Sequence, residues 1–204
     1  MPVYAQLREW LADGAIGEVR AMQSSFCIDR PVREPVAADR RYSAVLGGGT
    51  LLDIGIYAIT ASRIALPGVP VQGFDVRALR NDQGVDVQLG ATLDFGDGRH
   101  SQFTCGWFGD GPNRFVVLGT RGYVEVHGGF WQADAITLVR SGQAPQTVTL
   151  PFRINGFEYE IEESMRCIRA GLAESPLLPP AESLAVVELM DAMRARIGVR
   201  YPFE

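Results

Sequence analysis

Asp53 and Tyr57 are the two residues whose types and spacing best suit chemistry. They lie four residues apart in the sequence GGGTLLDIGIY, residues 47–57. On a helix, residues four apart share one face, with Cβ atoms about 5–6 Å apart. A carboxylate beside a phenol can take part in proton transfer or hold a substrate hydroxyl. The glycines also lead into a helix N-terminus, whose free backbone N–H groups can hold an anion.

The same residues have a structural interpretation that requires no function. Thr50 followed three residues later by Asp53 matches a capping box. Tyr57 could be a core aromatic residue whose hydroxyl is satisfied inside the protein. The spacing alone leaves both interpretations open.

Arg30 and Trp107 are weaker candidates for contacts with a substrate. Arg30 follows an expected strand and could hold an anionic or hydroxylated ligand, and Trp107 precedes a glycine-rich turn and could line a pocket. The alternatives are a solvated loop arginine and a core or interface tryptophan. The 19 basic residues are all arginine, so no lysine amine is available as acid, base or Schiff-base former.

Histidines and cysteines do not suggest a metal site. The three cysteines are far apart, and the sequence contains neither a CxxC nor an HExxH motif. His100 and His127 both fall in strand-like stretches. We therefore expect buried, reduced thiols, no metal and no catalytic histidine.

Charge and hydropathy exclude several classes of partner. A net charge of -5 argues against broad contact with nucleic acid or anionic lipid. The N-terminus does not resemble a signal peptide, and we see no apolar run long enough to cross a bilayer. We expect a cytoplasmic protein that binds neither nucleic acid nor membrane.

The positions of apolar and turn-forming residues predict the elements that hold these side chains. We expect helices at 3–13, 50–66, 156–172 and 180–197, with an exposed loop at 30–46. Glycine-rich turns at 96–98, 109–113 and 120–122 suit hairpins. The expected strands are 17–29, 71–79, 86–95, 99–108, 114–120, 122–128, 135–141 and 146–152.

Helices flanking one run of strands predict an α+β domain over residues 1–204. It would contain a largely antiparallel open sheet with helices packed on one face. Strands 86–95 and 99–108 look apolar on both faces, so we expect a second copy to cover the open face in a homo-oligomer. The chain shows no βαβ alternation and no GxGxxG, so we expect neither a Rossmann domain nor cofactor-binding residues.

The whole chain resembles the C-terminal domain of the glucose-fructose oxidoreductase / inositol dehydrogenase / MocA (Gfo/Idh/MocA) family. The resemblance rests on residues 47–68 (GGGTLLDIGIYAITASRIALPG), on ADGAIGEVR at 12–20 and on the two closing helical segments. Within the family the chain is most similar to the subgroup of dimeric dihydrodiol dehydrogenase and NADP-dependent xylose dehydrogenase.

The resemblance implies a domain that works beside a separate dinucleotide-binding domain. Asp53 and Tyr57 match the two motif residues at the family's active site, where Tyr57 would act in proton transfer or substrate orientation and Asp53 would hold the substrate hydroxyl. NAD or NADP and a catalytic lysine would belong to an N-terminal Rossmann domain, and residues 1–16 would be the linking helix. The substrate would be a small sugar, polyol or diol.

These observations lead to one main hypothesis and two alternatives. The main hypothesis is a substrate-binding and oligomerisation domain of an NAD(P)-dependent oxidoreductase acting on a sugar or diol CH–OH group, inactive as this fragment. A stand-alone, non-catalytic binding or scaffold module derived from that family is the second. The third is an independent acid–base enzyme that uses Asp53 and Tyr57. Whether this chain is itself an enzyme stays open at this point.

Overall fold

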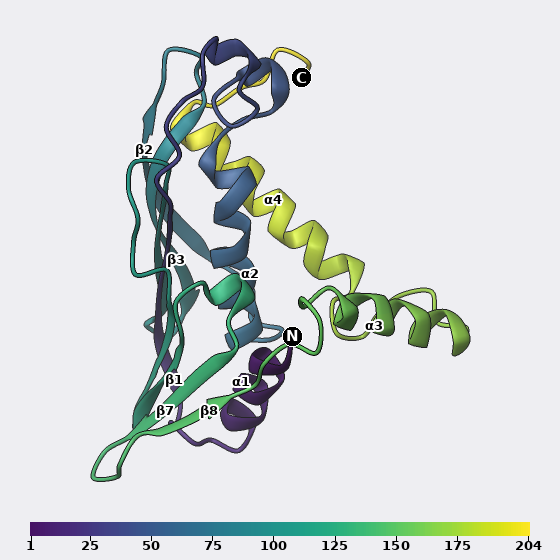
Figure 1. Cartoon of the computed structure of the whole chain (residues 1–204). Helices are drawn as coiled ribbons and strands as arrows, with labels where there is room; N and C mark the ends of the chain where they lie inside the picture. The colour runs from purple at the N-terminus through teal and green to yellow at the C-terminus, as the bar shows by residue number, and fades with distance from the viewer.

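Alternating side chains shape the middle of the chain into strands. In β3 (Asp86–Gly96), Val87, Leu89, Leu93 and Phe95 are buried, whereas Gln88 and Asp94, which alternate with them, are exposed. A computed structural model describes residues 1–204, and it contains eight strands (Figure 1). The others are β1 (Val19–Cys27), β2 (Gly73–Arg80), β4 (Arg99–Gly106), β5 (Phe115–Gly119), β6 (Gly122–Val126), β7 (Ala135–Arg140) and β8 (Gln146–Thr149).

The eight strands form one sheet in the order β2-β3-β4-β1-β5-β6-β7-β8. All neighbours are antiparallel except β1 and β4, which run parallel. The expectation of a largely antiparallel open sheet is therefore confirmed. The expected hairpin at 109–113 is wrong, because β1 lies between β4 and β5 and the segment crosses over it. Turn-forming residues predict a change of direction, but they do not determine which strand becomes the neighbour.

Helices cover one face of the sheet (Figure 1). The four α-helices are α1 (Pro2–Ala12), α2 (Ile56–Ala65), α3 (Glu158–Arg169) and α4 (Pro180–Ile197). Helix α2 packs on the sheet between α1 and α4, and the largest buried cluster joins all three helices to the inner face of the strands. Segment Ala44–Ala65 has the length and average hydropathy of a membrane span, but half of it is buried here, as in a core helix.

The open face of the sheet is polar over its first half, which corrects the expectation from sequence. In β3 and β4 the apolar side chains all point toward the helices. The open face instead carries Gln88, Thr92, Asp94, Gln102 and Thr104. Strict alternation along the strands puts apolar side chains on the helix-covered face and polar side chains on the open face. Small residues in the same strands made both faces look apolar in the sequence.

Candidate active site

The helix that carries Asp53 and Tyr57 begins with an unusual turn. It starts at Thr50, as the sequence predicts, but residues Leu51–Gly55 form a π-helical turn before α2 begins. Single π-helical turns are rare and occur often at functional sites. Propensity and spacing gave no indication of this turn.

Asp86, a buried residue of β3, holds this turn in place. Its carboxylate accepts hydrogen bonds from the Thr50 hydroxyl and the Leu51 N–H, both at 2.7 Å. A side chain at Gly49 would collide with the same carboxylate, since its Cβ would lie 2.5 Å from Asp86 Oδ1. The capping-box interpretation of Thr50 and Asp53 is therefore wrong: Thr50 bonds a residue of the sheet and makes no side-chain cap.

The backbone N–H groups of the glycine loop also donate hydrogen bonds within the chain. The Gly48 N–H donates to Ser43 O and the Gly49 N–H donates to Arg41 O. The Leu51 N–H at this helix N-terminus donates to the Asp86 carboxylate. The anion that the sequence predicts at this terminus is therefore a side chain of the same chain. These residues do not fit a dinucleotide phosphate. No three His, Cys, Asp or Glu side chains converge to hold a metal either.

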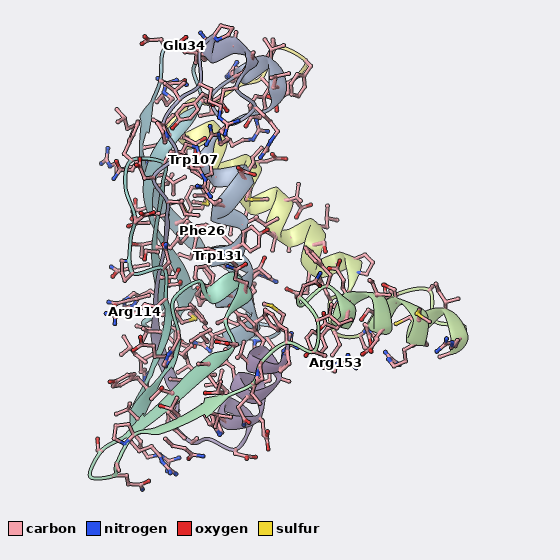
Figure 2. All side chains as sticks on the ribbon, viewed as in Figure 1. Phe26, Glu34, Trp107, Arg114, Trp131 and Arg153 are labelled. Atoms are coloured by element: carbon pink, nitrogen blue, oxygen red, sulfur yellow. The ribbon has the colours of Figure 1, made fainter.

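Tyr57 lies on the surface beside an aromatic cluster. It is 44% exposed, and its hydroxyl makes no hydrogen bond within the chain. Its ring meets the edge of Phe26, with centroids 5.5 Å apart. Phe26 in turn stacks flat on the partly buried Trp131, with centroids 3.5 Å apart and ring planes 3° from parallel (Figure 2). An exposed phenol with a free hydroxyl therefore lies next to an aromatic wall.

Asp53 is close enough to solvent to meet a ligand, and it already has one cationic partner. Its side chain is 27% exposed and forms an ion pair with Arg40 at 3.2 Å. The loop that carries Arg40 is held by Asp39, which accepts hydrogen bonds from the Arg33 and Arg41 backbone and from the Arg41 guanidinium. The Arg41 side chain holds the pKa of Asp39 well below its usual range.

Arg30 and Trp107 occupy different environments. Arg30 is exposed at the start of the loop that contains Arg40, and its N–H donates to Trp107 O. The Trp107 side chain is 3% exposed and belongs to the core, so it does not line an open pocket as the sequence suggested. Phe108, the next residue, is 61% exposed. Alternation along β4 and its continuation decides which of the two aromatic residues faces inward.

Sequence reasoning missed three residues of the site: Asp86, Arg40 and Trp131. Asp86 and Trp131 are remote in sequence from Asp53, and only the folded sheet brings them to the motif. For Arg40, the only signal was its place in the charged run DRR just before the glycines.

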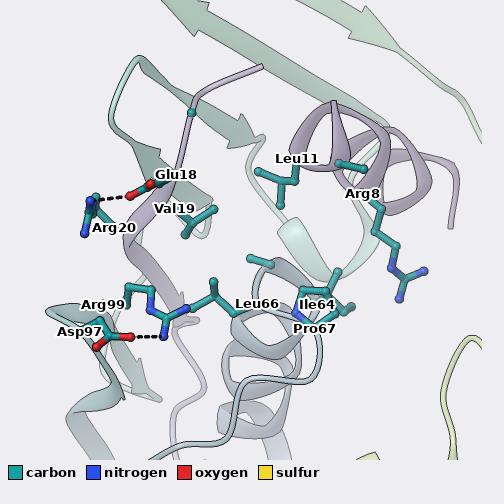
Figure 3. A pocket seen from close by; sticks show the side chains of 13 residues that line it. Arg8, Leu11, Glu18, Val19, Arg20, Ile64, Leu66, Pro67, Asp97 and Arg99 are labelled. Atoms are coloured by element: carbon teal, nitrogen blue, oxygen red, sulfur yellow. Dashed lines mark hydrogen bonds and ion pairs between the residues drawn. The ribbon is translucent and has the colours of Figure 1, made fainter. Parts of the chain in front are cut away.

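A separate hollow of about 600 Å³ lies at the other end of α2 (Figure 3). Its apolar side chains include Leu11, Val19 and Ile64, and two of its arginines are neutralised by ion pairs, Arg20 with Glu18 and Arg99 with Asp97. Neither Asp53 nor Tyr57 lines it. The hollow therefore is not part of the candidate site.

Comparisons with known proteins show the family of this domain. Residues 4–125 match the GFO/IDH/MocA C-terminal domain. Trans-1,2-dihydrobenzene-1,2-diol dehydrogenase of Xenopus tropicalis is 28% identical over 207 residues, which cover 98% of this chain and 61% of the relative. The chain thus spans about three fifths of the length of the curated relatives it matches.

Solved structures show the same fold. The 3-ketoreductase KijD10 of Actinomadura kijaniata, in complex with NADP and TDP-benzene, has a TM-score of 0.76 at 28% identity, covering 96% of this chain and 59% of its own. Aldose-aldose oxidoreductase of Caulobacter crescentus has a TM-score of 0.80 at 23% identity, covering 95% and 58%. The family match covers residues 4–125, which include most of the sheet and the helix with Asp53 and Tyr57. The chain therefore belongs to the GFO/IDH/MocA family and contains its C-terminal domain.

Proposed function

We propose that the chain is the substrate-binding domain of an NAD(P)-dependent oxidoreductase that acts on a CH–OH group of a sugar or diol. The observation that carries this proposal is the free, exposed Tyr57 hydroxyl, which lies four residues after the partly exposed Asp53 on one helix and next to an aromatic wall. The names of the curated relatives, diol dehydrogenases, support a vicinal diol as the substrate class.

In this proposal each side chain has a distinct role. The Tyr57 phenol would exchange a proton with the carbinol oxygen, and the Asp53 carboxylate would accept a hydrogen bond from a neighbouring hydroxyl. The partly exposed Trp131 would contact the apolar face of the substrate, with the buried Phe26 ring stacked behind it. Arg40 would compete with the substrate for Asp53, because it pairs with that carboxylate when no ligand is bound.

The nicotinamide chemistry would lie outside the residues described above. In enzymes of this class the cofactor accepts or supplies a hydride at the carbinol carbon. This chain contains no lysine, and its glycine loop uses its N–H groups internally. We therefore propose that the chain alone is inactive, and that a nucleotide-binding domain would have to be supplied for turnover.

Ligand titration of the isolated chain tests the substrate site. A small vicinal diol or xylose, added at millimolar concentration, should shift the backbone NMR signals of residues 50–58 and the Trp131 indole signal. Trp107, which is buried, serves as the internal control. Shifts confined to the open sheet face or to the hollow near Leu11, or no shifts at all, would contradict the proposal.

We also propose that the open sheet face is a contact between copies of the chain. No helix covers this face, although its first half is polar rather than apolar. Thr92, near the middle of β3 on that face, is partly buried already in one copy. Replacing it with arginine (Thr92→Arg) should weaken association measured by sedimentation, because an unpaired charge would face the second copy.

A further inference from the structure

A hollow of about 450 Å³ lies in the loop that precedes the glycines of the site. It is lined by residues 33–35 and 38–41, which include Arg33, Arg40 and Arg41. Arg40 also forms the ion pair with Asp53, so the hollow begins one arginine side chain away from that carboxylate. The function proposed for the site assigns no ligand to this hollow.

The arginines of the hollow differ in how far their charge is neutralised within the chain. Arg41 pairs with the buried Asp39 at 2.7 Å and therefore holds the loop together. Arg33 bonds the same carboxylate through its backbone N–H only, and its guanidinium makes no hydrogen bond or ion pair. Glu34, the other acid of the hollow, accepts a hydrogen bond from the Val36 N–H. The exposed Arg33 guanidinium is thus available to a ligand.

Arg40 is held by a contact that a substrate on Asp53 would weaken. Its side chain is 65% exposed, and a single guanidinium nitrogen reaches the two Asp53 oxygens at 3.2 and 3.3 Å. A substrate hydroxyl that donates to Asp53 competes for the same oxygens, so Arg40 loses part of its pairing. A neutral sugar offers no replacement for it. A substrate with an anionic group of its own does, because guanidinium groups bind carboxylate and phosphate oxygens strongly.

We propose that the substrate carries a carboxylate or a phosphate, which binds Arg40 and Arg33 in this hollow while the CH–OH group lies at Tyr57. The inference rests on the proposed function, because that function places the reacting group at Tyr57 and a neighbouring hydroxyl on Asp53. The volume of about 450 Å³ falls within the range of about 300–1,000 Å³ that is usual for small-molecule sites.

Binding of three matched sugars to the chain tests this inference. Glucose, glucuronate and glucose 6-phosphate differ only in the group at C6, and NMR titration measures the affinity of each. At low salt, one of the two anionic sugars should bind at least about tenfold more tightly than glucose, because it gains charge-assisted hydrogen bonds. The preference should shrink as salt is added. The chain has a net charge of -5 and does not attract anions as a whole, so such a preference has a local cause.

Two arginine variants and a matched control locate the contact. Arg40→Gln should bring the affinities for the anionic sugar and for glucose close to each other, and Arg33→Gln should reduce the difference between them. Arg40→Gln should also leave glucose binding unchanged or make it tighter, because Asp53 loses its competing partner. A misfolded variant would lose both ligands instead. Arg77→Gln removes an exposed arginine from the open sheet face and should change neither affinity.

The outcomes separate this inference from the function on which it rests. If glucose shifts the signals of residues 50–58 and neither anionic sugar binds more tightly, the anion contact is wrong and the proposed function stands. A preference that survives both Arg40→Gln and Arg33→Gln would also overturn the inference, because the anion would then bind elsewhere. If none of the three sugars shifts these signals, the inference and the proposed function are both wrong.

Discussion

Two residues near the start of the site helix, Asp86 of β3 and Tyr57 of α2, differ in what surrounds them and therefore in what they can do. Asp86 is fully buried, and its carboxylate is used to hold the turn at Thr50 and Leu51. Tyr57 is exposed, and its hydroxyl has no partner in the chain. A buried, bonded group contributes to stability, whereas an exposed, unbonded one is available to a ligand. Substitutions at the two positions should separate these roles.

Replacing Tyr57 with phenylalanine should cost less than about 0.5 kcal/mol of unfolding free energy, because no internal hydrogen bond is lost. Urea unfolding measures the change. The matched control is Tyr4→Phe, whose hydroxyl donates to Phe130 O in the core and whose loss should cost about 1–3 kcal/mol. A loss above about 2 kcal/mol for Tyr57→Phe would assign Tyr57 a structural role.

Replacing Asp86 with asparagine should destabilise the chain by about 2–3 kcal/mol, because two hydrogen bonds to a charged acceptor become bonds to a neutral one. Asp75→Asn is the control, since Asp75 is exposed on the neighbouring strand and should change stability by under about 0.5 kcal/mol. Amide exchange should also become faster at residues 51–55. An Asp86→Asn chain as stable as the original would refute the role assigned to this carboxylate.

At the scale of elements, the sequence predicted which helices and strands form better than it predicted how they are arranged in space. All four helices and all eight strands appear, because periodicity and turn residues act locally. The parallel pairing of β1 with β4 and the π-helical turn were not predictable in this way. Both depend on contacts between distant segments, such as the one from Thr50 to Asp86.

The start of α3 should loosen in acid. Burial raises the pKa of Glu158, but hydrogen bonds from backbone N–H groups outweigh that effect and lower the pKa to about 2. Because the folded-state value lies below the usual 4.5, the stabilisation is present above pH 4.5 and is lost as the pH falls toward 2. Amide exchange at Ile154 and Gly156, compared between pH 6 and pH 3 after correction for the intrinsic rate, measures this loss.

Glu158→Gln is the companion variant for this pH dependence. It should show weak protection at Ile154 and Gly156 at both pH values, because the charged acceptor is absent throughout. Protection in the unsubstituted chain that does not change with pH would show that the carboxylate does not anchor the helix.

At the scale of the whole molecule, the core lies inside the fold, whereas the candidate site is open to solvent. One buried cluster of 35 residues joins the inner face of the sheet to α1, α2 and α4, so the domain has what it needs to fold alone. The candidate site, in contrast, lies on the surface, where Tyr57 is 44% exposed. In the proposed function, a separate nucleotide-binding domain would hold the hydride acceptor.

The folded chain should therefore bind neither NAD nor NADP with micromolar affinity and should not oxidise sugars or diols. Its sheet is largely antiparallel, whereas a dinucleotide fold needs parallel strands with a glycine-rich turn, and the Gly48 and Gly49 N–H groups are already bonded inside the chain. Calorimetry with both cofactors and an absorbance assay over a panel of diols and sugars measure binding and turnover. A full-length dihydrodiol dehydrogenase is the positive control for both. Micromolar cofactor binding by this chain, or turnover above background, would mean that the domain has a nucleotide site of its own. The proposal that turnover needs a separate nucleotide-binding domain would then be wrong.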